Sequence, residues 1–408
     1  MFSGKLFTPR GLSGLDRLIA KELRWKVGVA MSATHEFSGV ESLTNLSRLR
    51  LAQSAWVPVL NVEGCADLTA VSTALSTIDF FDSIPSLQSV GPRVSVSADN
   101  DLFRTKKEKI FSALKAALPS RLHANEFSLN INHSNILSLQ TNLIPPRGWI
   151  RTPVQRNGGL EQLWSVVPLD SPKLCESAIK AFRNETSLAC LSAALVESSN
   201  LKSILKTEED LLIWDPFVGN GSVVLEVLAF LTENAQRPVT IVGNVGSRAS
   251  ADSVVGCVRE FAASLNLPLL EETGEAESGS NSKGRKSRRT TTPDPTDNER
   301  RVQTVTLGST TIHLTIAPFQ ETFPFISGAV ILTHIPKTYS EQLGIDKRTL
   351  TDWTAFGALL KANRNFQMFV LAETGSFFKY SKLKFSKLTH LVSPNGSAVG
   401  SISKWVGI

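Results

Sequence analysis

The strongest constraint on the fold is an apolar run that ends in a glycine turn, with the sequence LLIWDPFVGNGS at residues 211–222. The apolar residues before Asp215 predict a buried strand, and the apolar residues after Ser222 predict a helix. Gly219 and Gly221 let the backbone turn sharply and leave room for a ligand beside it. A nucleotide-like cofactor is the usual occupant of such a turn in an α/β sheet.

The rest of the carboxyl-terminal half alternates between strand and helix patterns. Apolar strand patterns recur at residues 211–214, 239–242, 311–316, 329–333 and 367–371, with helical patterns from residue 222 and at 251–265 and 353–362. This βαβ alternation predicts a mostly parallel sheet covered by helices. Two further strand patterns, at 388–392 and 399–402, predict an antiparallel hairpin around Asn395-Gly396.

Composition limits the partners and the chemistry. The formal net charge is +6, which favours a polyanionic partner. The four cysteines are scattered, so we expect buried thiols and no metal site or disulfide framework. No apolar run approaches the length needed to span a membrane, so we expect no membrane association. The amino terminus is basic but shows no clear cleavable presequence, which leaves a cytoplasmic or a mitochondrial location open.

The lead-in Asp-Pro-Phe and the glycine loop resemble motif I of S-adenosylmethionine (SAM)-dependent methyltransferases. Within them the motif is similar to the branch that modifies RNA guanines at N2, and the nearest likeness is to the THUMP-containing large-subunit rRNA enzymes of bacteria. The resemblance implies an α/β fold with a Rossmann-like methyltransferase domain. It also implies SAM as the cofactor, held by Asp215, Pro216, Phe217, Gly219, Asn220, Gly221 and Asn244. Asn244 stands where these enzymes carry an acid for the cofactor ribose.

The amino-terminal half resembles the ferredoxin-like and THUMP α/β RNA-binding modules of the same enzymes. The opening T-P-R-G-L at residues 8–12 and P-R-G-W at 146–149 carry this likeness. We expect domains at 1–62 (ferredoxin-like), 63–151 (THUMP-like) and 173–408 (methyltransferase), with a linker at 152–172 and a disordered insertion at 271–301. We also expect a basic loop to contact RNA phosphates, together with a later arginine: Arg104, Lys106, Lys107, Lys109 and Arg147.

The target-base motif departs from the family pattern. These enzymes grip the base with [ND]-P-P-[YF] after the fourth strand, whereas residues 334–339 read H-I-P-K-T-Y. His334 replaces the Asn or Asp, Ile335 replaces the first proline, Pro336 is retained, and Tyr339 is the nearest aromatic residue. A neutral histidine still offers one acceptor nitrogen.

Two functions therefore stay open. One is a weakly active or inactive descendant that binds structured RNA, rRNA rather than tRNA, and acts on ribosomal assembly intermediates. The other is an active SAM-dependent rRNA or tRNA guanine-N2 methyltransferase with an atypical target-base motif. These enzymes use one acid for the cofactor ribose, here replaced by Asn244, and another for the adenine amine, which is absent from residues 316–320. The loss of both acids and of the base-gripping motif favours the first function. A Rossmann oxidoreductase is disfavoured because the glycine loop lacks G-x-G-x-x-G spacing.

Overall fold

The computed structural model describes residues 1–78, 82–84, 93–99, 101–122, 125–144, 151–156, 159–164, 189–207, 210–234, 237–264, 267–273, 302–322, 326–336 and 347–407. The chain divides into two compact units. The first comprises Met1–Ala194 with Val392–Ser397, and the second comprises Leu195–Leu391 with Ala398–Ile408.

The first unit is built on a six-stranded sheet in the order β2-β1-β3-β6-β5-β4. Its strands are β1 (Phe2–Phe7), β2 (Glu36–Val40), β3 (Ser54–Val62), β4 (Arg93–Ala98), β5 (Glu126–Ile131) and β6 (Leu137–Asn142). Its helices are α1 (Asp16–Lys26), α2 (Leu68–Ser76), α3 (Asp101–Arg104) and α4 (Lys107–Ala117). Because β3 pairs with β6, the expected ferredoxin-like and THUMP-like segments share one continuous sheet.

The structure refines two sequence expectations for this unit. The apolar spacing of Leu43, Leu46, Leu49 and Leu51 predicts a helix, and the structure has a short 3-10 helix there, η2 (Leu43–Arg48). The expected basic loop is largely helical, since Arg104 ends α3 and Lys107 and Lys109 lie in the first turn of α4. Short 3-10 turns commonly serve as connectors, and apolar spacing alone does not separate them from α-helix. The shorter 3-10 helices of the unit are η1 (Pro9–Gly11) and η4 (Ser120–Leu122).

A hairpin lies inside the segment expected to be a linker. β7 (Arg151–Arg156) and β8 (Gly159–Trp164) form a separate two-stranded antiparallel sheet. The sequence there is rich in Pro, Gly and polar residues, which describes a hairpin turn as well as it describes a linker.

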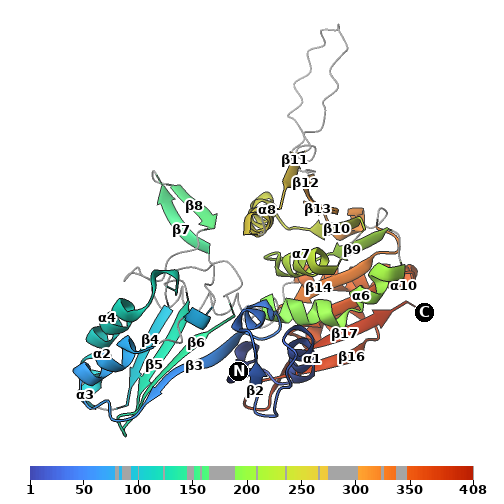
Figure 1. The fold of residues 1–408 in the computed structure, drawn as a ribbon. Coiled ribbons are helices and arrows are strands. Elements are labelled where there is room, and N and C mark those ends of the chain that lie inside the picture. Colours follow the sequence, from blue (N-terminus) through green and yellow to red (C-terminus); the bar gives the residue numbers. More distant parts are fainter. Residues whose placement is uncertain are drawn as a thin grey trace. The chain divides into compact units, whose positions relative to one another are not determined.

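The second unit contains a nine-stranded sheet in the order β11-β12-β13-β10-β9-β14-β15-β17-β16. Its strands are β9 (Leu211–Asp215), β10 (Val239–Asn244), β11 (Leu269–Thr273), β12 (Val302–Leu307), β13 (Thr310–Thr315), β14 (Val330–Ile335), β15 (Gln367–Ala372), β16 (Ser386–Val392) and β17 (Ala398–Val406). Its helices are α6 (Leu201–Thr207), α7 (Ser222–Asn234), α8 (Arg248–Ser264), α9 (Phe319–Thr322), α10 (Lys347–Ala362) and α11 (Gly375–Ser381). The predicted parallel core of β13, β10, β9, β14 and β15 is confirmed (Figure 1).

The segment 271–301, which we expected to be a disordered insertion, overlaps a strand at its start. Residues 271–273 belong to β11, which pairs antiparallel with β12 from residue 302 onward. The charged residues 271 and 272 suggested disorder, yet edge strands commonly carry charge. Residues 274–301 lie outside the described part of the chain.

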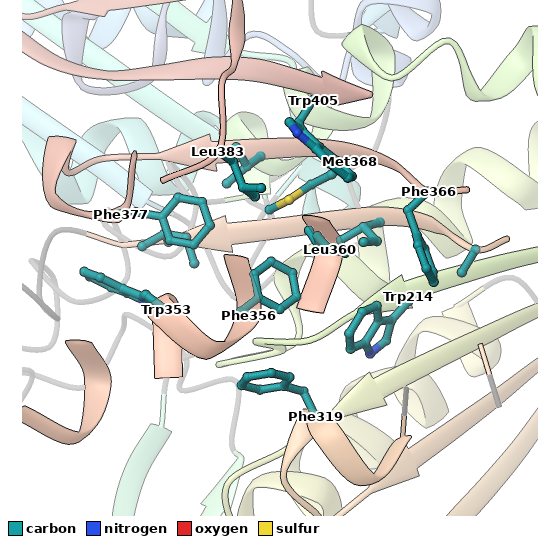
Figure 2. Packing of buried hydrophobic residues seen from close by; sticks show 14 of the residues in the cluster. Trp214, Phe319, Trp353, Phe356, Leu360, Phe366, Met368, Phe377, Leu383 and Trp405 are labelled. Carbon is teal, nitrogen blue, oxygen red and sulfur yellow. The ribbon is translucent and has the colours of Figure 1, made fainter. Parts of the chain in front are cut away.

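An aromatic core packs against the central strands of this sheet. Trp214 on β9 lies next to Phe356 of α10, with ring centroids 5.8 Å apart, and Phe356 lies 5.5 Å from Phe319 of α9 (Figure 2). Trp214 and Phe356 are completely buried. The same cluster contains Trp353 and Phe377, whose centroids are 5.7 Å apart. This packing fixes α9 and α10 beside the strand ends where a ligand site is expected.

Candidate functional site at the carboxyl ends of β9, β10 and β14

The order of the strands defines a switch point. From β9 the chain proceeds to β10 and β13 on one side and later to β14 and β15 on the other. In open α/β sheets, ligands bind at the carboxyl ends of the strands where the order reverses, which here lies between β9 and β14. Asp215 ends β9, and Thr333 and His334 lie near the end of β14.

The glycine loop connects β9 to α7. Gly219 and Gly221 have φ values of +57° and +83°, a region in which L side chains are strained. A Cβ on Gly221 would lie 2.9 Å from Cγ2 of Val254 on α8, so this glycine is also required for packing. A Cβ on Gly219 would meet only the carbonyl oxygen of Phe217, at 3.8 Å, so the space beside Gly219 is open. Asn220 supports the turn, because its Oδ1 accepts a hydrogen bond from the backbone N–H of Ser222 at 3.2 Å.

Asp215 is a completely buried carboxyl group. Its Oδ1 accepts hydrogen bonds from Thr333 Oγ1 at 2.7 Å and from the backbone N–H of Phe217 at 3.1 Å. Its Oδ2 is buried without a hydrogen-bond partner within the described residues. Burial raises the pKa of Asp215 from 3.8 to about 7, although the bonds from Thr333 and Phe217 oppose the rise. The orphaned oxygen is a ready partner for a polar or cationic group of a ligand.

Asn244 is bound within the protein rather than presented to a ligand. Its Oδ1 accepts from Trp214 Nε1 at 2.8 Å. Its Nδ2 donates to the carbonyl oxygen of Ala317 at 3.0 Å and to Oγ1 of Thr322 at 2.8 Å. Both amide hydrogens therefore have partners, and the side chain joins the end of β10 to the segment that follows β13. Asn244 thus links neighbouring parts of the protein, and its contact with a cofactor ribose stays a prediction.

Aromatic rings from the cofactor loop, α9 and α10 pack against one another, and Phe319 lies in sequence between Ala317 and Thr322, two partners of Asn244. Phe217 packs edge-on against Phe319 and Phe356, at centroid distances of 6.1 and 5.4 Å. Phe217 is half-buried, while Phe319 is buried. Pro216, which precedes Phe217, lies in the turn after β9. Phe217 is thus part of the aromatic core as well as of the candidate cofactor loop.

His334 forms a buried pair with Glu373. His334 Nε2 lies 3.1 Å from Glu373 Oε1, and the two residues are only 8% and 7% exposed. Glu373 follows β15, and its backbone N–H donates to the carbonyl oxygen of Ile335 at 2.9 Å. A carboxylate on Nε2 favours the tautomer that carries hydrogen there and leaves Nδ1 as the acceptor.

The other residues of the expected target-base motif have different positions in the structure. The side chain of Ile335 is buried in the aromatic core cluster, so it is a packing residue. Pro336 is half-buried at the end of β14. Tyr339 and Lys337 lie outside the described residues.

The expected RNA-contacting residues gather at the start of α4 in the first unit. Lys106 is the N-cap of α4, and no side chain caps this helix start. Arg104, Lys107 and Lys109 are exposed, and Lys106 is half-buried. The positive end of the helix dipole and the lysines at this helix start together favour an anion. Arg147 lies outside the described residues.

No family model matches the chain, and no curated protein matches it. Among solved structures, it is similar to SMU.472, a candidate methyltransferase crystallised with SAH. The TM-score is 0.52 and the identity 14%, over 100% of this chain and 98% of that one. It also matches a predicted N6-adenine-specific DNA methylase from Listeria monocytogenes (TM-score 0.48, 13% identity, covering 100% and 96%). A third match is a possible methylase from Clostridium difficile (0.49, 12%, 100% and 98%).

The chain shares the fold of SMU.472. At this identity the likeness shows the fold alone, a mixed α/β architecture like that of a candidate methyltransferase. In the described residues, no group of three or more His, Cys, Asp or Glu side chains could hold a metal ion. None of the helices searched there is long and apolar enough to cross a membrane. Cys65, Cys190 and Cys257 are buried, as predicted.

Sequence analysis missed three residues of the site. Thr333 is the last residue of the predicted strand 329–333, and Glu373 lies two residues after the predicted strand 367–371. Parallel strands end at one edge of a sheet. Polar residues at those ends could therefore have been nominated. Thr322 is 78 residues from its partner Asn244, and no sequence signal connects the two.

Proposed function

We propose that this protein is an RNA-binding member of the SAM-dependent RNA guanine-N2 methyltransferase group in which methyl transfer is weak or lost. The fold shared with SMU.472 supports the methyltransferase ancestry. The observation that carries the loss of function is the side chain of Asn244, whose oxygen and both amide hydrogens are bound inside the protein. Asn244 lacks the charge of the usual acid, and because its amide hydrogens are already used, it offers a ribose hydroxyl only a neutral acceptor, a loss of about 1–3 kcal/mol.

The residues present fit one end of SAM better than the other. When bound, SAM supplies an electrophilic methyl group on a sulfonium. The orphaned Oδ2 of Asp215 and the open space beside Gly219 fit the amino-acid end of such a ligand. The ribose end lacks an acid, because Asn244 stands in its place and is hydrogen-bonded within the protein. We therefore expect weak cofactor affinity.

RNA binding is proposed for the first unit. The uncapped start of α4 and the cationic side chains around it fit phosphate groups, and the chain as a whole carries a net charge of +6. The THUMP-like character of residues 63–151 and the preference for rRNA come from the sequence resemblance. In this proposal the protein holds structured rRNA during ribosome assembly.

The His334–Glu373 pair favours a second candidate, an active methyltransferase. Guanine N2 must lose a proton when it is methylated, and a histidine whose Nε2 is held by a carboxylate has Nδ1 available to accept hydrogen. In that case His334 would replace the Asn or Asp of the usual motif. The aromatic partner for the base would still have to come from a residue outside the described part, such as Tyr339.

One experiment separates RNA binding from methyl transfer. Purified protein is titrated with a structured rRNA fragment, and the same samples are incubated with tritiated SAM. The proposal expects RNA binding, weakened by the double variant Lys107→Glu/Lys109→Glu, and no methyl incorporation above the level of a His334→Ala variant. Incorporation that depends on His334 would favour the active enzyme instead. RNA affinity that is unchanged in the double variant would contradict the placement of the RNA site.

A further inference from the structure

The first unit carries aromatic and basic side chains on one face of β1 and β3. Lys5 is directly opposite Trp56, and Phe7 is directly opposite Ser54. Opposed residues of antiparallel strands point to the same face, so all four lie together. Leu6, between them on β1, points the other way and is 1% exposed. Phe7 is 45% exposed, which is unusual for an aromatic ring on a sheet.

These side chains border an open depression of about 630 Å³. Its lining includes Lys5, Phe7, His35, Gln53, Ser54 and Trp56. Lys5 Nζ lies 6.0 Å from the centre of the Phe7 ring, within cation–π range. Trp56 Nε1 donates to Ser54 Oγ at 3.0 Å, which holds the indole in place. The depression therefore combines a cation with two oriented aromatic rings.

The same face continues across the sheet as a polar surface. Pro58, which follows Trp56 on this face of β3, is opposite Gln140 of β6. Gln140 is in turn opposite Ser128 of β5, and Ser128 is paired with Ser95 of β4. Gln140 and Ser95 are exposed. α2 and α4 cover the other face of β4 and β5 (Figure 1). A sheet with helices on one face and hydroxyl and amide groups on the other offers hydrogen bonds to sugars and phosphates.

We propose that this face, defined by Lys5, Phe7 and Trp56, binds an unpaired segment of RNA by stacking a base in the depression. The inference rests on the RNA-binding half of the proposed function and is independent of the cofactor site. Aromatic side chains beside a cation are the usual platform for single-stranded nucleic acid, because every base presents a π-face. Lys5 supplies the positive charge that a neighbouring phosphate needs, and the hydroxyl of Ser54 suits a ribose 2′-OH. A protein partner would leave the polar remainder of this face without a clear role.

The test uses the full chain and a fluorescent oligouridine, with the matched DNA oligomer and an RNA duplex as comparisons. Phe7→Ala removes one ring, Trp56→Phe keeps a ring in place of the indole, and Lys5→Ala removes the cation. Trp25→Ala is the control, because Trp25 is a 58% exposed aromatic residue of α1 that does not line the depression. Thermal melting of each variant confirms that it is folded. Ultraviolet crosslinking to 4-thiouridine RNA locates the contact without any variant.

Phe7→Ala is expected to weaken single-stranded RNA binding about 5- to 100-fold without changing its salt dependence. Lys5→Ala should reduce the salt dependence by about one phosphate contact. Trp56→Phe and Trp25→Ala should bind nearly as well as the wild type, and crosslinks should map to residues 5–7 or 53–56. Equal affinity of Phe7→Ala and wild type, or crosslinks confined to α4, would overturn the inference but leave the proposed RNA binding intact. Tighter binding of the duplex or of DNA would also overturn it.

Discussion

Replacing Asp215 by asparagine should remove a large pH-dependent part of the stability of the second unit. The carboxyl group is fully buried, and burial raises its pKa from 3.8 to about 7. A group whose pKa is raised on folding stabilises the folded state below the unfolded pKa, and this stabilisation is lost as the pH rises through the folded pKa. Between pH 5 and pH 8 the loss amounts to about 2–3 kcal/mol, from the roughly two pH units between pH 5 and the raised pKa.

An asparagine at position 215 keeps an acceptor for Thr333 and for the backbone N–H of Phe217 but cannot ionise. We therefore compare the unfolding free energies of the wild type and of Asp215→Asn, measured by urea denaturation at pH 5 and at pH 8. From pH 5 to pH 8 the wild type should lose about 3 kcal/mol more than the variant. Other titrating groups contribute equally to the two proteins, so their contribution cancels in this comparison. In a unit of this size the effect corresponds to about 6–12 °C in melting temperature. Parallel stability profiles for the two proteins would refute the buried, uncharged state of Asp215.

Three other substitutions test neighbouring parts of the site. Gly219→Arg should abolish any SAM binding that calorimetry detects, because the arginine fills the open space beside the loop, and RNA affinity should be unchanged. Retained SAM binding would show that the cofactor does not bind beside Gly219. Gly221→Ala should lower the unfolding free energy by about 1–3 kcal/mol, because the new Cβ would clash with Val254 and because position 221 has a positive φ. An unchanged urea midpoint would show that the loop can relax. Glu373→Ala should cost about 1–3 kcal/mol by leaving buried His334 without its partner, whereas a neutral result would mean that solvent reaches the imidazole.

The parallel core was predictable from the sequence because its strands are buried on both faces. β9 and β14 are nearly continuous apolar runs, and such runs mark the interior of a parallel sheet. The glycine turn after β9 was equally readable, since the positive φ values at Gly219 and Gly221 admit few other residues. Local signals of this kind located Asp215, Asn244 and His334 at strand ends.

The partners of these residues were not predictable. Asn244 looked like a ligand-facing substitute for an acid, but its bonds run to Trp214, Ala317 and Thr322, and those contacts depend on how α9 packs beside β10. The pairing of His334 with Glu373 likewise needs the register of β14 against β15. In the first unit, Trp56 joins the face of Lys5 and Phe7 only when β1 and β3 pair, because Trp56 is far from both in sequence.

Calorimetric titration of the purified protein with SAM tests the central claim most directly. In the proposed function, cofactor affinity is weak because Asn244 replaces the ribose-binding acid and is hydrogen-bonded within the protein. We therefore expect no detectable binding until SAM reaches about millimolar concentration. Binding with a Kd of about 1 μM, close to −8 kcal/mol, would contradict this expectation and establish a competent cofactor site.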